Sequence, residues 1–140
     1  MGDRCYMWVI VRKDDAPKFL GFLPRGWADQ IEESDLAVTL VYEQANYGYG
    51  EELSRAAAAG CEFYGHHGQG SSYDGAEFHT SGNEALYVYM GQDESGVIID
   101  GDTPQKRLEN LRLTERLISQ RDELIKRMNN PIYDMIKETA

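Results

Sequence analysis

The sequence predicts an α+β or open α/β fold in a single domain spanning residues 1–140. Stretches rich in β-branched and aromatic residues recur between residues 5 and 100, and a long amphipathic helical pattern follows them. Because a sheet and a helix each bury an apolar face against the other, we expect one mixed sheet of about five strands with helices packed on it. The hydrophobic content of 41% is typical of a globular domain.

The first half of the chain supplies two expected strands with helical segments between and after them. Residues 5–13 are apolar on both alternating faces, which predicts a central strand, and residues 36–42 have a similar composition. Residues 14–17 carry the acidic and proline signals of a helix start, and residues 27–33 are interpreted as one or two helical turns. This order of elements allows a right-handed parallel crossover. A second helix is expected over residues 51–59.

The second half of the chain predicts a meander followed by a long helix. Residues 65–75 are rich in glycine, serine and histidine and are interpreted as a loop. The strands expected after this loop cover residues 76–80, 84–90 and 97–100. The last element is a helix over residues 104–128, which begins at Pro104 and is capped by Asp102 or Thr103.

The apolar residues of the 104–128 helix occupy one arc, which favours packing across the sheet. The seven-residue spacing of Leu111, Ile118 and Ile125 leaves self-association through this helix as an alternative. Arg121 falls inside the apolar arc, where a guanidinium group needs a polar partner. We therefore predict that Arg121 pairs with an acid of the sheet or of a second subunit.

Acidic residues dominate the middle of the chain. The whole sequence has 24 acidic and 14 basic side chains and a formal net charge of −10. Residues 28–102 hold fifteen of the acidic side chains and one basic residue, Arg55. Nucleic-acid binding needs clustered cations to neutralise phosphates, so this balance disfavours direct binding of nucleic acid. A surface of one sign attracts a basic partner, although an acidic composition also serves solubility or adaptation to salt.

Seven of the nine tyrosines lie within the same acidic part of the chain, between residues 42 and 89. Tyrosine offers a large rigid contact area and is enriched at interfaces, whereas packing beneath a helix or loop is the alternative explanation. The overlap of tyrosines with carboxylates predicts a partner-binding surface. Its expected members are Glu43, Tyr47, Tyr49, Glu51, Glu52, Tyr73, Asp74, Glu77, Asp93 and Glu94.

The three histidines of the chain, His66, His67 and His79, lie close together in sequence, and Cys61 precedes them. Imidazole, thiolate and carboxylate groups are ligands of zinc, so the histidines are a candidate zinc site. The signal is weak because no H-x-x-x-H or C-x-x-C spacing occurs, and neighbouring residues of an extended chain point to opposite sides. No set of catalytic residues is identified, so we expect no cofactor and favour binding over catalysis.

The sequence therefore favours a non-catalytic binding or inhibitor protein whose acidic, tyrosine-rich segment docks on a basic protein surface. A nucleic-acid-processing enzyme has such a surface, and a phage-type inhibitor that mimics nucleic acid is one form of this hypothesis. The first alternative is a small metal-dependent hydrolase that uses His66, His67 and His79. The second is an assembly module that forms a homodimer through the helix over residues 104–128.

The sequence predicts no contact with a membrane. Its longest apolar run covers residues 6–11, far fewer than the ~20 residues that cross a bilayer, and its start has no apolar signal core. The two cysteines are too few for a secreted disulfide framework. We therefore expect a cytoplasmic protein.

Overall fold

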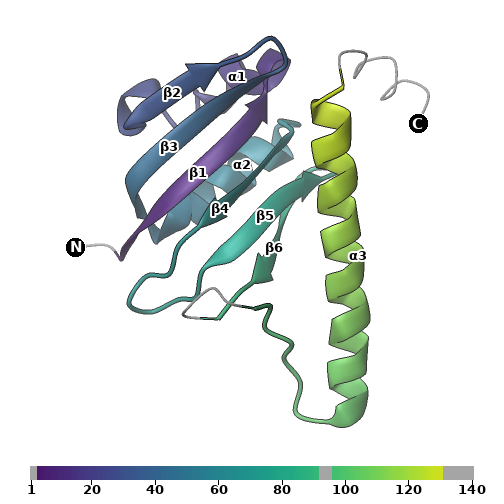
Figure 1. The fold of residues 1–140 in the computed structure, drawn as a ribbon. Coiled ribbons are helices and arrows are strands. Elements are labelled where there is room, and N and C mark those ends of the chain that lie inside the picture. Colours follow the sequence, from purple (N-terminus) through teal and green to yellow (C-terminus); the bar gives the residue numbers. More distant parts are fainter. Residues whose placement is uncertain (1–2, 92–95, 131–140) are drawn as a thin grey trace.

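The computed structural model describes residues 3–91 and 96–130, which form one six-stranded sheet with helices on both faces (Figure 1). The strands are β1 (Arg4–Arg12), β2 (Gln30–Glu33), β3 (Ala37–Asn46), β4 (Phe63–His67), β5 (Ala76–Ser81) and β6 (Glu84–Tyr89). Their spatial order is β2–β3–β1–β4–β5–β6, and every neighbouring pair is antiparallel. The α-helices are α1 (Ala16–Phe19), α2 (Gly50–Ala58) and α3 (Pro104–Met128). Short 3-10 helices cover η1 (Lys13–Asp15), η2 (Arg25–Trp27) and η3 (Tyr47–Tyr49).

The predicted α+β class, the central strand and the long C-terminal helix are confirmed. Strand β1 lies third in the sheet order, with β3 and β4 on either side. Helix α3 has the predicted bounds, and the Thr103 hydroxyl caps it by accepting a hydrogen bond from the Lys106 N–H at 3.1 Å. Helix α2 also forms where the sequence placed it, and Gly60 follows it with φ +92°, a conformation that favours glycine.

Two segments differ from the sequence prediction. The helical turns expected over residues 27–33 are wrong, because Gln30–Glu33 form β2, which pairs with β3 and widens the sheet. The loop expected from residue 65 is wrong at its start, because Phe63–His67 form β4. Glycine and histidine are poor strand formers, but backbone pairing with β1 on one side and β5 on the other overrides that preference here.

The sheet is antiparallel rather than mixed, so it has no parallel crossover. The short β2 leads directly into β3, and β3 returns antiparallel to β1. The strand expected over residues 97–100 is reduced to one isolated bridge between Met90 and Val97. The meander expected after the loop therefore consists of β5 and β6 alone, joined through Gly82 at φ +61°.

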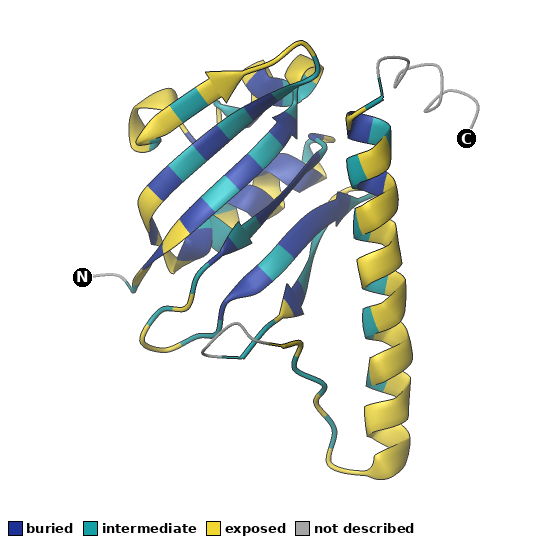
Figure 2. Cartoon of the chain, viewed as in Figure 1, coloured by how far each residue is buried: buried dark blue, intermediate teal, exposed yellow. Residues whose placement is uncertain are grey.

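The main core lies between one face of the sheet and helices α1 and α2. Side chains alternate along β1 and β3, so every second residue of each strand points into this core, as the dark blue bands of Figure 2 show. The fully buried members include Met7, Val9, Leu40, Tyr42, Phe19, Leu53, Phe63 and Phe78.

The second core is smaller and lies between the opposite sheet face and the C-terminal half of α3. Leu124 and Met128 are 1% and 2% exposed and pack with Tyr64 of β4. Trp8 and Ile10 of β1 point to this face and pack at the border of the cluster. Helix α3 does not extend over the strands that lie farthest from it, so this face of the sheet is open there.

Arg121 of α3 has the partner that the sequence predicted. Its Nη1 lies 3.7 Å from Glu77 Oε2 of β5, and its Nη2 donates a hydrogen bond to the Gly65 carbonyl oxygen at 3.2 Å. The guanidinium also lies 5.5 Å from the centre of the Tyr64 ring, within the range of a cation–π contact. These contacts hold a charged side chain inside an apolar arc.

The N-terminal half of α3 extends past the sheet (Figure 1). Leu108, Leu111, Leu113 and Ile118 are between 39% and 55% exposed. The predicted packing of α3 across the sheet therefore buries side chains only in its C-terminal half, whereas the N-terminal half makes more open contacts with β6 and the segment after it. Within residues 3–91 and 96–130, α3 and the other helices are too short or too polar to cross a membrane.

The close contact between β1 and β4 predicts that substitution of Gly65 lowers the stability of the fold. A Cβ atom at this position would overlap the Trp8 carbonyl oxygen and the Phe78 ring. We expect Gly65→Ala to lower the free energy of unfolding by about 1–3 kcal/mol, because overpacking forces backbone shifts. Gly26→Ala is the matched control, since nothing lies within 4 Å of the added atom. Urea denaturation would measure both variants, and equal stabilities would contradict the tight β1–β4 approach.

Candidate partner-binding surface

Three segments that are distant in sequence meet at one end of the sheet. They are the N-terminus of β1, the β3–α2 connection and the β4–β5 loop (Figure 1). The Asp3 carbonyl oxygen accepts hydrogen bonds from the Tyr47 N–H at 2.7 Å and from the Tyr73 hydroxyl at 3.0 Å. Asp3 therefore joins the two tyrosine-bearing segments.

The Asp3 carboxylate also fixes the β4–β5 loop. The backbone N–H groups of Ser71 and Ser72 donate to its two oxygens at 2.8 Å and 2.7 Å, and both serine hydroxyls donate to the same carboxylate. These hydrogen bonds stabilise the ionised form and lower the pKa of Asp3 to about 2, with the Ser72 hydroxyl making the largest contribution. The loop is thus held by a charge that lies 68 positions earlier in the sequence.

Two tyrosines of the β3–α2 connection have unusual backbone conformations. Tyr47, Gly48 and Tyr49 have φ values of 54°, 60° and 48°, so three consecutive residues are left-handed. This conformation is costly for a tyrosine and persists only where the surroundings impose it. Next to Gly48 lies the His67 ring, 3.3 Å from where a Cβ atom would be. The turn directs Tyr47 outward, where it is 58% exposed.

Aromatic rings continue from this turn to the edge of the sheet. Tyr49 stacks on Trp27 with ring centres 5.1 Å apart, and it meets the buried Tyr42 edge-on at 5.4 Å. Tyr47 lies 6.2 Å from Tyr73 across the junction of the two segments. Trp27 is 45% exposed and Tyr47 is 58% exposed, whereas Tyr42 is buried. The group of rings is therefore anchored in the core and accessible at the surface.

Two carboxylates lie near the Tyr49 hydroxyl. Desolvation raises the pKa of the Tyr49 hydroxyl, the Glu52 and Asp29 carboxylates raise it further, and Arg4 opposes them. The Asp29 carboxylate accepts a hydrogen bond from the Glu43 N–H at 2.7 Å, which holds this carboxylate against the backbone of β3.

Two cations reduce the charge of this region. The Arg4 Nη1 donates to Gln44 Oε1 at 3.2 Å, and Arg55 Nη2 lies 3.0 Å from Glu51 Oε1 along α2. Both pairs are exposed, and such pairs contribute little energy. We call this region the acidic aromatic end. Its members are Trp27, Asp29, Glu43, Tyr47, Tyr49, Glu51, Glu52 and Tyr73.

Not every residue predicted for the surface belongs to the acidic aromatic end. Asp74 follows Tyr73 in the β4–β5 loop and is half-buried. Glu77 lies apart on β5, where its charge is paired with Arg121 of α3. Asp93 and Glu94 lie outside the described residues. Trp27 and Asp29 lie in a segment whose pattern predicts helical turns, and Asp3 binds Ser71 from 68 positions away, so no local signal placed these three residues in the surface.

The three histidines do not gather at one place. His66 and His79 point to the α3 side of the sheet, whereas His67 points into the main core. His66 stacks with Trp8, and the His67 Nδ1 lies 2.9 Å from the Gly68 carbonyl oxygen. Among the described residues, no three His, Cys, Asp or Glu side chains are placed to hold one metal ion.

The two cysteines are buried thiols. Cys5 and Cys61 are 5% and 0% exposed. Burial raises the pKa of the Cys61 thiol, and the nearby Asp15 carboxylate raises it further. A raised pKa disfavours the reactive thiolate, so the geometry of Cys61 does not suit a nucleophile.

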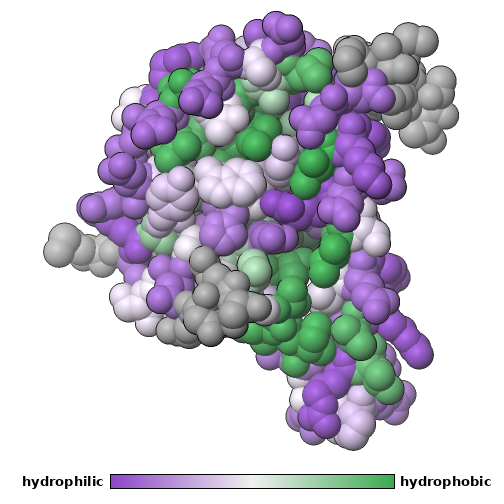
Figure 3. Space-filling view, viewed as in Figure 1, coloured by the Kyte–Doolittle hydropathy of each residue, from purple (hydrophilic) through white to green (hydrophobic). Residues whose placement is uncertain are grey.

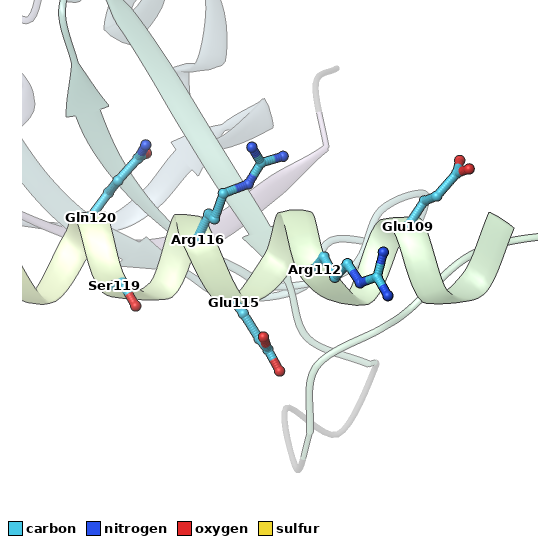
Figure 4. Close-up of a pocket in the computed structure, with 6 residues that line it drawn as sticks. All are labelled: Glu109, Arg112, Glu115, Arg116, Ser119 and Gln120. Atoms are coloured by element: carbon cyan, nitrogen blue, oxygen red, sulfur yellow. The ribbon is translucent and has the colours of Figure 1, made fainter. Parts of the chain in front are cut away.

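The polar side chains that line the concave surface along α3 do not converge on one point. It is lined by Glu109, Arg112, Glu115, Arg116, Ser119 and Gln120. All six residues come from one helix, and Figure 4 shows their side chains spread along it and pointing in different directions. A binding pocket needs a few polar groups that converge on one point, which this surface lacks.

No protein-family model, curated protein or solved structure matches the chain. The functional inference therefore depends on the chemistry of this chain's own side chains rather than on analogy of fold.

The hydrogen bonds between the Asp3 carboxylate and the β4–β5 loop predict a local response to acid. The lowered pKa means that the stabilisation is present above pH 3.8 and is lost as the pH falls towards about 2. We expect Asp3→Ala to speed amide hydrogen exchange at Ser71 and Ser72 at neutral pH, because their acceptor is removed. Exchange measured by NMR checks this, and unchanged rates at the two serines would show that the loop is held by other contacts.

His79 predicts a second pH dependence, at higher pH. Its side chain is fully buried between β5 and α3, and burial lowers its pKa below the usual 6.5, while Gln120 opposes the shift and Arg121 adds to it. The unfolded chain then binds a proton that the folded chain excludes, so stability is lost as the pH falls below 6.5. We expect His79→Leu to flatten this part of the stability profile in urea denaturation from pH 7.5 to about 5. A variant with the wild-type slope would contradict the assignment to His79.

Proposed function

We propose that this protein is a non-catalytic binding protein whose acidic aromatic end docks on a basic surface of another protein. The observation that carries the proposal is the stacked Trp27–Tyr49 pair with the carboxylates of Asp29 and Glu52 near the Tyr49 hydroxyl, and with the Glu43 backbone hydrogen-bonded to Asp29. Exposed aromatic rings are typical anchors of protein interfaces, where they exclude water from the centre of the contact. The carboxylates at the rim supply attraction and orientation.

A nucleic-acid-processing enzyme is the proposed class of partner. Its phosphate-binding groove presents clustered cations, which carboxylates can engage in place of phosphates. The net charge of −10 attracts such a groove over a distance and repels nucleic acid itself. The proposal places the protein in the cytoplasm, where it would act as an inhibitor by occupying the groove.

The strained Tyr47–Tyr49 turn also supports the proposal. Left-handed tyrosines cost free energy that a purely structural turn would avoid by using glycine or asparagine. The hydrogen bond from the Tyr47 N–H to the Asp3 carbonyl oxygen and the stacking of Tyr49 on Trp27 hold this turn in one conformation before any partner binds. A preorganised surface loses less conformational entropy on binding, which increases affinity.

Charge reversal within the acidic aromatic end tests the proposal. We expect the double variant Glu43→Lys/Glu52→Lys to lose partners that the wild-type protein captures from a cell lysate at about 50 mM salt, where charges act beyond 10 Å. Glu109→Lys/Glu123→Lys on the exposed face of α3 has the same change in charge and should capture them normally. Captured proteins identified by mass spectrometry should be released by a DNA duplex and by about 300 mM salt.

Two results would count against the proposal. Equal loss of capture in both double variants would show that net charge, and not this surface, attracts the partners. Capture that neither variant changes, or that salt and duplex leave intact, would show that binding uses another part of the molecule.

A further inference from the structure

Helix α3 carries an apolar stripe that its own sheet does not cover. The stripe is formed by Leu108, Leu111, Ile118 and Ile125, which lie within about 100° of arc beside the face that contacts the sheet. The first three are 55%, 42% and 39% exposed. Ile125 is partly buried against the second core, so the stripe leads from the open N-terminal half of α3 to the border of that core.

Helix α3 is longer than the part of it that buries side chains against the sheet. Its 25 residues span about 37 Å, yet its two buried side chains, Leu124 and Met128, lie in the last two turns. In Figure 3, hydrophobic side chains lie uncovered along the edge of α3 and beside its N-terminal half. A helix half that exposes leucines gains little stability from propensity alone, so a packing partner would stabilise it.

We propose that the stripe binds the same stripe of a second copy of this chain, with the two α3 helices antiparallel. A two-fold axis near residues 114 and 115 places Leu111 of each copy opposite Ile118 of the other. The same register places Arg107 opposite Asp122, once on each side of the axis. One patch is thus used twice, as closed two-fold symmetry requires.

Charge complementarity selects the antiparallel arrangement. In this register Glu115 faces Thr114 of the second copy, and each arginine at 107 faces an aspartate. A parallel pair would place Arg107, Glu115 and Asp122 each beside the same residue of the second copy, which costs free energy. The dimer is independent of the proposed function, although it would present two acidic aromatic ends to a partner and increase avidity if that function holds.

Disulfide trapping of the full chain tests the register. Leu111→Cys and Ile118→Cys change exposed side chains, and the native Cys5 and Cys61 are buried. A mixture of the two variants should form a disulfide-linked dimer under mild oxidation. Each variant alone should not, because two residues seven positions apart along an antiparallel pair exceed the ~7 Å Cα separation that a disulfide tolerates. Efficient cross-linking of Leu111→Cys with itself would overturn the antiparallel arrangement.

Charge exchange tests the interface without cysteines. We expect Arg107→Asp to weaken dimerisation about tenfold, and the double variant Arg107→Asp/Asp122→Arg to restore it. Arg116→Asp on the opposite face of α3 is the control with the same change in charge. Sedimentation equilibrium measures all four proteins. A wild-type chain that stays monomeric at about 100 μM, or a double variant no tighter than the single one, would overturn the proposal.

Discussion

Burial of strand β1 on both of its faces is the constraint on which the rest of the structure depends. Its alternate side chains enter two different cores, so Met7 and Val9 pack under α2 whereas Trp8 and Ile10 meet the cluster beneath α3. A strand of this kind must lie inside the sheet, and β3 and β4 accordingly pair with it on either side. The pairing with β4 favours Gly65, because a Cβ atom at this position would overlap the Trp8 carbonyl oxygen and the Phe78 ring.

The same strand also fixes the acidic aromatic end. Asp3 lies directly before β1, and its carboxylate and carbonyl oxygens bind the β4–β5 loop and the β3–α2 turn. The exposed ring of Tyr47 and the partly buried ring of Tyr49 are therefore held at a rigid end of the sheet rather than on loose loops. Rigid presentation of these rings would lower the entropic cost of binding at the proposed surface.

Some charged side chains of this protein hold the fold together, and others lie at the surface without such a role. Glu77 and Arg121 are used internally, where they help to dock the C-terminal half of α3 on the sheet. Asp3 holds a loop, and Asp29 holds the Glu43 backbone. The Glu52 carboxylate lies near the Tyr49 hydroxyl, and Glu43 is exposed. The proposed binding surface therefore rests on the aromatic rings as well as on the negative charge.

Local signals determined much of this protein from its sequence. The apolar run at β1, the glutamates that begin α2 and the Thr103–Pro104 start of α3 each act within a few residues, so these elements and the α+β class could be predicted. Even the pairing of Arg121 with an acid followed from its place in an apolar arc. Tertiary structure alone decided the β2 and β4 strands, because pairing with neighbours distant in sequence outweighs weak local propensity. Tertiary structure also paired Glu77 with Arg121 of α3 and joined Asp3 to Ser71, because side-chain proximity across a sheet depends on register rather than on sequence spacing.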